Sequence, residues 1–182
     1  MVKYVFLVEE RSMAEFLEGF LRKNSDLEFQ VVPHRGKDDL KASVPRKLRG
    51  MNRADTTFVI LVDQDSSDCK VLKDEFTSIC IKIAQANFKV RIICRELEAW
   101  YLGDLFAVDK AFGTKLYRER NRERHREPDK WEHAKEYLQK LINNHGQIDI
   151  AKKMANAMTP ESISANRSKS FLVFLNTLGL KF

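Results

Sequence analysis

Residues 57–65 read Thr57-Phe58-Val59-Ile60-Leu61-Val62-Asp63-Gln64-Asp65, an apolar run that ends in two carboxylates. The apolar run predicts a buried strand. An unpaired buried charge is too costly for either aspartate to lie in the core, so we expect both at the end of this strand. Because side chains in a strand alternate between its two sides, Asp63 and Asp65 should face one side and Gln64 the other. In open α/β sheets, ligands bind at this edge.

Predicted strands and helices alternate around this run. Further strands are expected over 2–8, 27–32 and 88–94. Between them we expect a helix capped by Ser12 and helices over 37–49 and 69–86, with Pro45 either kinking the second or starting another. This order predicts an α/β, Rossmann-like fold, in which a mostly parallel sheet is flanked by helices on both faces.

The pattern changes after residue 94, where helices are expected over 95–102, 131–142, 148–158 and 168–178. We therefore divide the chain into an α/β core over 1–112 and a helical C-terminal region over 113–182. The two should pack together as one structural unit, since 182 residues suit a single domain.

Two other predicted strand ends carry acidic residues. Glu9 and Glu10 follow the first strand, and only one of two adjacent side chains can face the shared edge. Glu96 and Glu98 follow the strand over 88–94 and lie about 200° apart on a helix, so only one can serve this site. Mg²⁺ prefers hard oxygen ligands, so these acids predict a divalent-cation site. Each glutamate equally suits a solvated loop or a helix N-terminus.

Two nearby residues have both a functional and a structural interpretation. Asp68 is close enough in sequence to join the metal ligands, but it also suits the N-cap of the next helix, which we favour. Lys37 follows the turn at His34-Arg35-Gly36 and would steady a phosphate near the metal. A lysine at a helix start is more often simply solvated.

The charge balance favours a polyanionic partner without requiring one. The net charge is +6. Basic residues gather in 114–130, namely Lys115, Arg118, Arg120, Arg122, Arg124, Arg126 and Lys130. Such a segment either contacts nucleic-acid phosphates or is a solvated helix or loop, because Glu119 and Glu123 partly neutralise it.

Composition excludes several classes of protein. The chain is 43% hydrophobic and 32% charged, which is typical of a globular protein rather than a disordered one. It lacks a run of ~18 apolar residues and a signal-peptide pattern, so we expect a cytoplasmic protein with no membrane partner. Cys69, Cys80 and Cys94 are too widely spaced for a zinc knuckle or redox pair, and common nucleotide, hydrolase and metalloprotease motifs are missing from the sequence.

Several motifs together resemble a known family. Glu9 after the first strand, with Asp63-x-Asp65 after a later one, resembles the signature of the Toprim domain of primases, topoisomerases and OLD-type (overcoming lysogenization defect) nucleases. More closely, the chain resembles a bacterial Toprim-like family related to the OLD-type nuclease domain. The motifs that carry this resemblance span nearly the whole chain: Val8-Glu9-Glu10-Arg11-Ser12-Met13, His34-x-Gly36-Lys37-x-Asp39-Leu40, Asp63-Gln64-Asp65-Ser66-x-Asp68-Cys69, the run 95–104, and Asn166-Arg167-Ser168-x-Ser170-Phe171.

The resemblance implies a Toprim-like fold and a nuclease that depends on Mg²⁺ or Mn²⁺. Glu9 would be a metal ligand or general acid/base, Asp63 and Asp65 would hold the ion, and Glu96 or Glu98 would match a later acidic ligand. Where OLD-type sites often carry a further carboxylate this chain has Met13, so the resemblance does not imply a full two-metal site. The candidate residues are Glu9, Lys37 and Glu96 for catalysis, Glu9, Asp63, Asp65, Asp68 and Glu98 for metal binding, and Lys37, Arg95, Arg118, Arg122, Arg124 and Arg167 for nucleic-acid binding.

The same resemblance implies DNA or RNA as substrate, an ABC-type ATPase partner and a role in phage defence, and it leaves a homo-oligomer open. Two alternatives remain. One is a non-catalytic Toprim fold that binds nucleic acid or a partner, which Met13 and the incomplete acid set suggest. The other is a receiver-like phospho-acceptor domain, whose acidic pocket Glu9, Glu10 and Asp63 would imitate, although no fifth strand with a following Lys is evident.

Overall fold

The structure, a computed structural model of the chain, describes residues 3–83, 86–143 and 145–182. Its first half alternates strands and helices: β1 (Lys3–Val8), α1 (Arg11–Asn24), β2 (Glu28–Pro33), α2 (Lys37–Met51), β3 (Thr56–Asp63), α3 (Cys69–Ile81) and β4 (Asn87–Ile93). The second half is helical, with α4 (Leu97–Leu102), α5 (Leu105–Phe112), α6 (Ala134–Leu141), α7 (Gln147–Ala157), α8 (Pro160–Ser164) and α9 (Lys169–Thr177). Short 3₁₀ turns lie between α5 and α6 at Leu116–Glu119, Glu123–His125 and Pro128–Lys130.

The strands form one parallel sheet in the order β2-β1-β3-β4 within the described residues. The predicted α/β, Rossmann-like fold is therefore confirmed. Val8 pairs with Leu61, so β3 runs on past the end of β1 to Asp63, which pairs with Ile93. β1 and β3 are neighbours, and this register brings the acidic residues after them to the same edge of the sheet.

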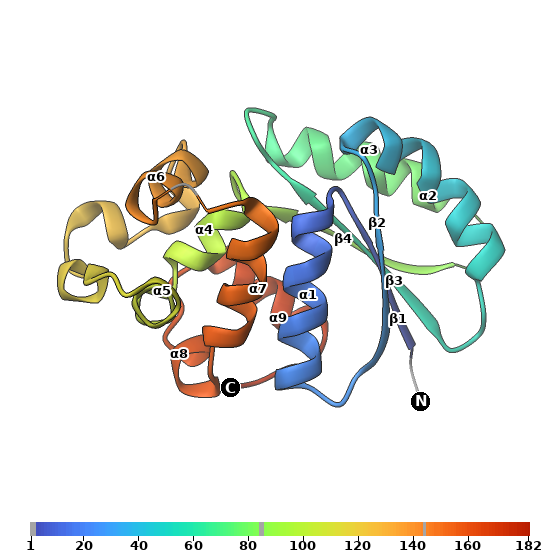
Figure 1. Cartoon of the computed structure of the whole chain (residues 1–182). Helices are drawn as coiled ribbons and strands as arrows, with labels where there is room; N and C mark the ends of the chain where they lie inside the picture. The colour runs from blue at the N-terminus through green and yellow to red at the C-terminus, as the bar shows by residue number, and fades with distance from the viewer. Residues whose placement is uncertain (1–2, 84–85, 144) are drawn as a thin grey trace.

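Helices cover the two faces of the sheet unequally (Figure 1). On one face α2 and α3 pack against alternate strand residues, in a core that includes Val5, Phe58, Leu48 and Phe76. On the other face α1 and the C-terminal helices share a larger core; its members include Phe6, Phe16, Trp100, Met154 and Phe174. The C-terminal helices thus bury their apolar sides on α1 and the sheet, and this packing fixes the position of α4 beside the carboxyl edge.

The structure corrects several local predictions. Helix α2 runs through Pro45 without a break, so a separate second helix there is wrong; the proline removes one backbone donor but a helix tolerates this with a kink. Ser12 does not cap α1, because Glu10 occupies the N-cap and the Ser12 hydroxyl donates to the Glu10 carboxylate. The predicted strand residue Val2 and the end of the helix predicted over 69–86, at residues 84–85, lie outside the described residues.

Helices α5 and α8 were not predicted, since short amphipathic helices give little periodic signal. In the part of the chain that the structure describes, no helix combines the length and hydropathy that a bilayer crossing requires.

Candidate metal centre at the carboxyl edge of the sheet

Glu9 and Asp63 meet at the ends of β1 and β3. Glu9 Oε2 accepts a hydrogen bond from the backbone N–H of Asp63, with an N···O distance of 3.3 Å. Asp63 Oδ1 is buried and has no hydrogen-bond partner among the described residues. A buried carboxylate oxygen without a donor is costly, and in native proteins such an atom calls for a functional or ionic explanation.

Neighbouring acids make this position more unfavourable for negative charge. Burial raises the pKa of Asp63 well above its usual range, and Glu98, Glu9, Glu10 and Asp65 raise it further. The pKa of Glu9 is also raised by burial, although Lys37 and the hydrogen bond from Asp63 N act in the opposite direction. Like charges gathered in a half-buried site favour proton or cation uptake.

Glu98 and Tyr101 approach the same point from α4. Glu98 is 7% exposed, and burial raises its pKa to about 7, with Lys135 opposing and Glu96 and Glu10 adding to the rise. The buried hydroxyl of Tyr101 has no hydrogen-bond partner in the described part of the chain, and its pKa is raised well above normal by burial and then by Glu98 and Asp63. Sequence reasoning missed Tyr101, although its spacing three residues after Glu98 places both on one helix face.

The two loops that follow β3 and β4 hold each other in place. Asp65 and Arg95 both have left-handed backbones, with φ of 53° and 61°, and Asp65 N donates to Arg95 O at 2.8 Å. Gln64 joins the loops, because its Oε1 accepts from Arg95 N at 3.2 Å and its Nε2 donates to Ser67 O at 3.0 Å. Non-glycine residues in this region of backbone space cost free energy and concentrate at functional sites.

The left-handed turn at Asp65 overturns the expected strand alternation of Asp63 and Asp65. The strand ends at Asp63, so period-two geometry does not reach Asp65. The Asp65 carboxylate forms an ion pair with Lys37 instead, with Nζ 2.7 Å from Oδ2. Lys37 comes from the start of α2, so it stands at this edge as the sequence suggested, paired with an acid of the cluster.

Other candidate residues have structural partners. Glu96 Oε2 accepts from the backbone N–H of Lys135 at 2.9 Å and so satisfies a free donor at the start of α6. Asp68 Oδ1 caps α3 by accepting from Lys70 N and Val71 N at 2.8 and 3.0 Å. Of the two glutamates after β4, Glu98 is therefore the one that acts on Asp63.

We call the carboxyl end of the sheet, where Glu9, Asp63 and Glu98 lie, the acidic edge. A cavity of about 370 Å³ adjoins it. Arg95 lies on its wall and forms an ion pair with Glu132 at 3.1 Å. His133 also lines this cavity from the start of α6, and sequence reasoning did not single it out. The remaining lining residues are Asp65, Ser66 and Glu96.

The arginine-rich segment forms 3₁₀ turns rather than a continuous helix. Glu119 pairs with both Arg122 and Arg124, at 3.1 and 2.9 Å. Arg118 is exposed and has no carboxylate partner within the described ranges. Arg167 lies outside this segment and donates to the carbonyl oxygen of Arg120. The structure therefore brings Lys37 and Arg95, but none of these other arginines, into contact with the acidic edge.

One observation speaks against a bound cation at this edge, and another speaks for it. In residues 3–83, 86–143 and 145–182, no group of three or more His, Cys, Asp or Glu side chains is arranged as a metal site. The donor chemistry suits a hard cation, however, because Glu9, Asp63 and Glu98 offer carboxylate oxygens and no described residue donates a hydrogen bond to Asp63 Oδ1. Ligation would require these side chains to turn toward one another.

Comparison of the whole sequence with known families gives one informative result. Residues 8–179 match the family described as a domain of unknown function (DUF4276), and the chain belongs to that family. Comparisons with curated proteins and with solved structures gave no match.

Proposed function

We propose that this member of the DUF4276 family is a divalent-metal-dependent nuclease of Toprim type that hydrolyses phosphodiester bonds of DNA or RNA at the carboxyl edge of its sheet. The observation that carries the proposal is the buried Oδ1 of Asp63, which lies among Glu9, Glu10, Asp65 and Glu98 and has no hydrogen-bond partner in the described part of the chain. A fold gains no stability from such a cluster, so a bound cation is its simplest physical purpose.

A Mg²⁺ or Mn²⁺ ion held by Glu9, Asp63 and Glu98 would supply the positive charge that offsets charge developing on a phosphodiester. As the alternative to ligating the ion, Glu9 would accept a proton from the attacking water, and burial raises its pKa in the direction that favours proton uptake. Lys37 would hold a phosphate oxygen of the substrate after releasing Asp65. Asp65 and Gln64 fix the loop that carries these groups.

The cavity beside the edge provides a place for the substrate strand. Arg95 stands on its wall, and Lys37 lies at the neighbouring end of α2. We propose that these two cations contact the substrate backbone directly, whereas Arg118, Arg122, Arg124 and Arg167 would act at longer range. The ABC-type ATPase partner and the role in phage defence rest on the resemblance of the motifs alone.

Cleavage of single- and double-stranded DNA and of RNA, with Mg²⁺ or Mn²⁺, tests the nuclease proposal. The variant Asp63→Ala/Asp65→Ala should lose metal-dependent cleavage. The matched control Asp26→Ala/Glu123→Ala removes the same charge from exposed positions and should cleave like the original protein. Equal cleavage by the acidic-edge variant and the original protein would remove the nuclease proposal.

A second candidate, a non-catalytic module for nucleic acid or a protein partner, has two observations in its favour. No three acids in the described residues are arranged as a metal site, and Met13, where OLD-type sites often have a carboxylate, is fully buried in the core. Calorimetric titration with Mn²⁺ separates the two candidates. Binding that disappears in Asp63→Ala supports the nuclease, and lack of binding supports the module.

The receiver-like alternative shares the strand order seen here, since some doubly wound folds also run 2-1-3-4 before a fifth strand. In the described residues the sheet ends at β4, and Lys37 pairs with Asp65 rather than Asp63. Incubation with acetyl phosphate should therefore leave Asp63 unmodified.

A further inference from the structure

The segment that leads into α6 carries a glutamate that lies between two cavities. Glu132 lines the cavity of about 370 Å³ beside the acidic edge, together with Arg95 and His133. It also lines a cavity of about 450 Å³, together with Arg124 and Trp131. The two cavities therefore adjoin at Glu132, and a ligand that extends from the acidic edge into the second cavity passes this side chain.

Hydrogen bonds on both sides of Glu132 hold this segment in place. On the N-terminal side, Asp129 Oδ2 accepts from Ser170 N at 2.8 Å. On the C-terminal side, Lys135 N donates to Glu96 Oε2 at 2.9 Å. The segment is thus fastened to the start of α9 and to the loop after β4, so the backbone around Glu132 has a defined position relative to that loop.

Left-handed backbone occurs on both sides of the contact between this segment and the loop after β4. Arg95 has φ of 61°, and His133, the residue after Glu132, has φ of 63°. A non-glycine residue in this region of backbone space costs free energy, and such residues concentrate at functional sites. The fold therefore accepts strain beside both partners, which is not expected of a chance surface contact.

Arg95 and Glu132 form an ion pair, with 3.1 Å between Nη2 and Oε1. The side chain of Arg95 is 31% exposed and that of Glu132 is 67% exposed. Within the described ranges Glu132 takes part in no second ion pair. A pair as exposed as this one adds little to stability, because water screens it. Its main effect is therefore on what Arg95 can bind.

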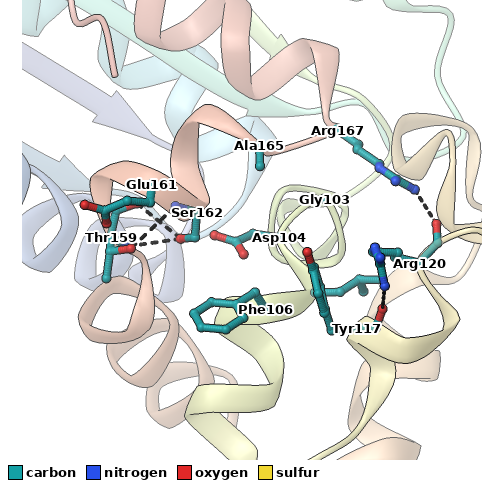
Figure 2. Close-up of a pocket in the computed structure, with 11 residues that line it drawn as sticks. Gly103, Asp104, Phe106, Tyr117, Arg120, Thr159, Glu161, Ser162, Ala165 and Arg167 are labelled. Atoms are coloured by element: carbon teal, nitrogen blue, oxygen red, sulfur yellow. Dashed lines mark hydrogen bonds between the residues drawn. The ribbon is translucent and has the colours of Figure 1, made fainter.

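Two arginines of another cavity are held by the backbone instead. In the cavity of about 490 Å³ at the junction of α4, α5 and α8, Arg120 donates to Tyr117 O at 3.2 Å and Arg167 donates to Arg120 O, as the dashed lines in Figure 2 show. A backbone carbonyl moves only with its chain, whereas the exposed side chain of Glu132 can rotate into water. Arg95 can therefore exchange its partner for a ligand without a change of backbone.

A carboxylate and a phosphate are alternative partners for a guanidinium group, because both offer oxygens to its N–H donors. We propose that Glu132 occupies on Arg95 the place of a backbone phosphate of the nucleic acid, so that the substrate reaches this arginine only by displacing Glu132. Glu132 thereby lowers the affinity of the free protein for nucleic acid. This role rests on the proposed function, because nucleic acid is taken as the ligand of Arg95, but it concerns binding and does not require cleavage.

A double-mutant cycle of nucleic-acid binding tests the role of Glu132. Fluorescence anisotropy of labelled DNA and RNA strands of about 12 nucleotides measures Kd for the full chain. A chelator prevents cleavage, and the salt concentration is about 0.15 M. Glu132→Gln should tighten binding about threefold, and Arg95→Gln should weaken it about fivefold. In the double variant the gain should disappear, so that it binds within about 1.5-fold of Arg95→Gln.

Glu123→Gln is the matched control for the loss of one negative charge. Glu123 lines the same cavity of about 450 Å³, is exposed, and forms no ion pair in the part of the chain that the structure describes. Its substitution therefore removes a nearby charge without freeing an arginine. Binding should stay within about 1.5-fold of the original protein, because salt screens exposed charges from one another.

Three results would overturn the role of Glu132: binding by Glu132→Gln no tighter than by the original protein, an equal gain in the Arg95→Gln background, or an equal gain from Glu123→Gln. Lack of binding by every variant would overturn it as well. Thermal unfolding verifies that each variant is folded, and the comparison of Glu132→Gln with Glu123→Gln remains decisive if Arg95→Gln unfolds.

The nuclease proposal fails by a different result, namely equal cleavage by Asp63→Ala/Asp65→Ala and the original protein. The expected cycle without any cleavage would keep the role of Glu132 and assign it to a non-catalytic module. Cleavage that depends on Asp63 and Asp65, together with a cycle that shows no coupling between Arg95 and Glu132, would overturn the role of Glu132 alone.

Discussion

The acidic edge and the arginine-rich segment differ in whether their charged side chains have an oppositely charged partner nearby. At the edge, Glu9, Asp63 and Glu98 come from separate elements and meet around a buried oxygen that has no partner in the described residues. In the segment 114–130 the arginines are close in sequence, yet Arg122 and Arg124 share Glu119 as a local counter-charge. Arg122 and Arg124 are thus neutralised by an acid of their own segment, whereas the acids at the edge are brought together by the topology of the sheet.

This difference has a physical cause. Neighbours in a turn can pair at little cost, because long exposed side chains reach one another and water screens what remains. Acids at parallel strand ends cannot avoid one another, since the register of β1 and β3 sets their separation. The edge therefore holds unfavourable interactions that a ligand can relieve, and the segment does not.

The largest expected effect is on cleavage. Asp63→Asn keeps the size of the side chain but removes its charge, and we expect metal-dependent cleavage to fall by about 10³-fold, as for the loss of a central electrostatic group. Arg122→Gln/Arg124→Gln should reduce cleavage by less than about threefold, because both arginines are engaged with Glu119. Initial cleavage rates with Mn²⁺ compare the two variants. A greater loss of rate in the arginine variant would show that the arginine-rich segment, rather than the acidic edge, is needed for cleavage.

The next effect is on stability and concerns Glu98. Burial raises the pKa of Glu98 from 4.5 to about 7, so the folded protein holds a proton that the unfolded chain releases. The free energy of unfolding should therefore fall as pH rises from about 4.5 to about 7 and stay low above it. Glu98→Gln removes this fall and should stabilise the protein at pH 8 by at most about 3 kcal/mol.

Urea unfolding between pH 4 and pH 8, in buffer with a chelator, measures this effect. Glu9 and Asp63 also have raised pKa values, and Glu98 is one cause of the rise at Asp63, so the difference between the variant and the original protein reports Glu98 together with its effect on Asp63. Glu123→Gln, an exposed glutamate of the second 3₁₀ turn with no ion pair among the described residues, is a suitable control and should leave the pH profile unchanged. Destabilisation by Glu98→Gln at pH 8 would show that Glu98 has a favourable partner in the fold.

Much of this organisation could be predicted from sequence. The run 57–62 predicts β3 because it is too apolar for an exposed element, and acids after β1 and β3 must share an edge once the sheet is parallel. The cap at Asp68 follows from its position before an amphipathic helix. These features depend on local pattern and on one rule of topology.

Other features depend on contacts between distant segments, which sequence patterns do not contain. Glu96 and Glu98 look equivalent after β4, and only the docking of α6 assigns Glu96 to a backbone N–H. The left-handed backbone of Asp65 follows from its bond to Arg95 in another loop.

A smaller effect is expected from Glu96. Glu96→Ala removes the acceptor for Lys135 N at the start of α6, and the loss should resemble that of a helix cap, about 1 kcal/mol. Glu96→Gln keeps an acceptor oxygen and should cost less. Urea unfolding measures both variants, and metal-dependent cleavage by Glu96→Gln should stay within about twofold of the original. Loss of cleavage with unchanged stability would move Glu96 from a structural to a catalytic role.

The smallest effect is expected from Arg124, which pairs with Glu119 at 2.9 Å and lies over the ring of Tyr137 at 5.6 Å. Arg124→Gln should cost about 0.5 kcal/mol of unfolding free energy, since both interactions are near the surface. Its effect on the salt dependence of nucleic-acid binding should be smaller than that of Arg118→Gln, because Arg118 has no carboxylate partner in the described ranges. Filter binding across a series of salt concentrations measures both slopes. Equal slopes would mean that the segment opens its ion pairs to bind phosphates, and the contrast with the acidic edge would then hold only for the free protein.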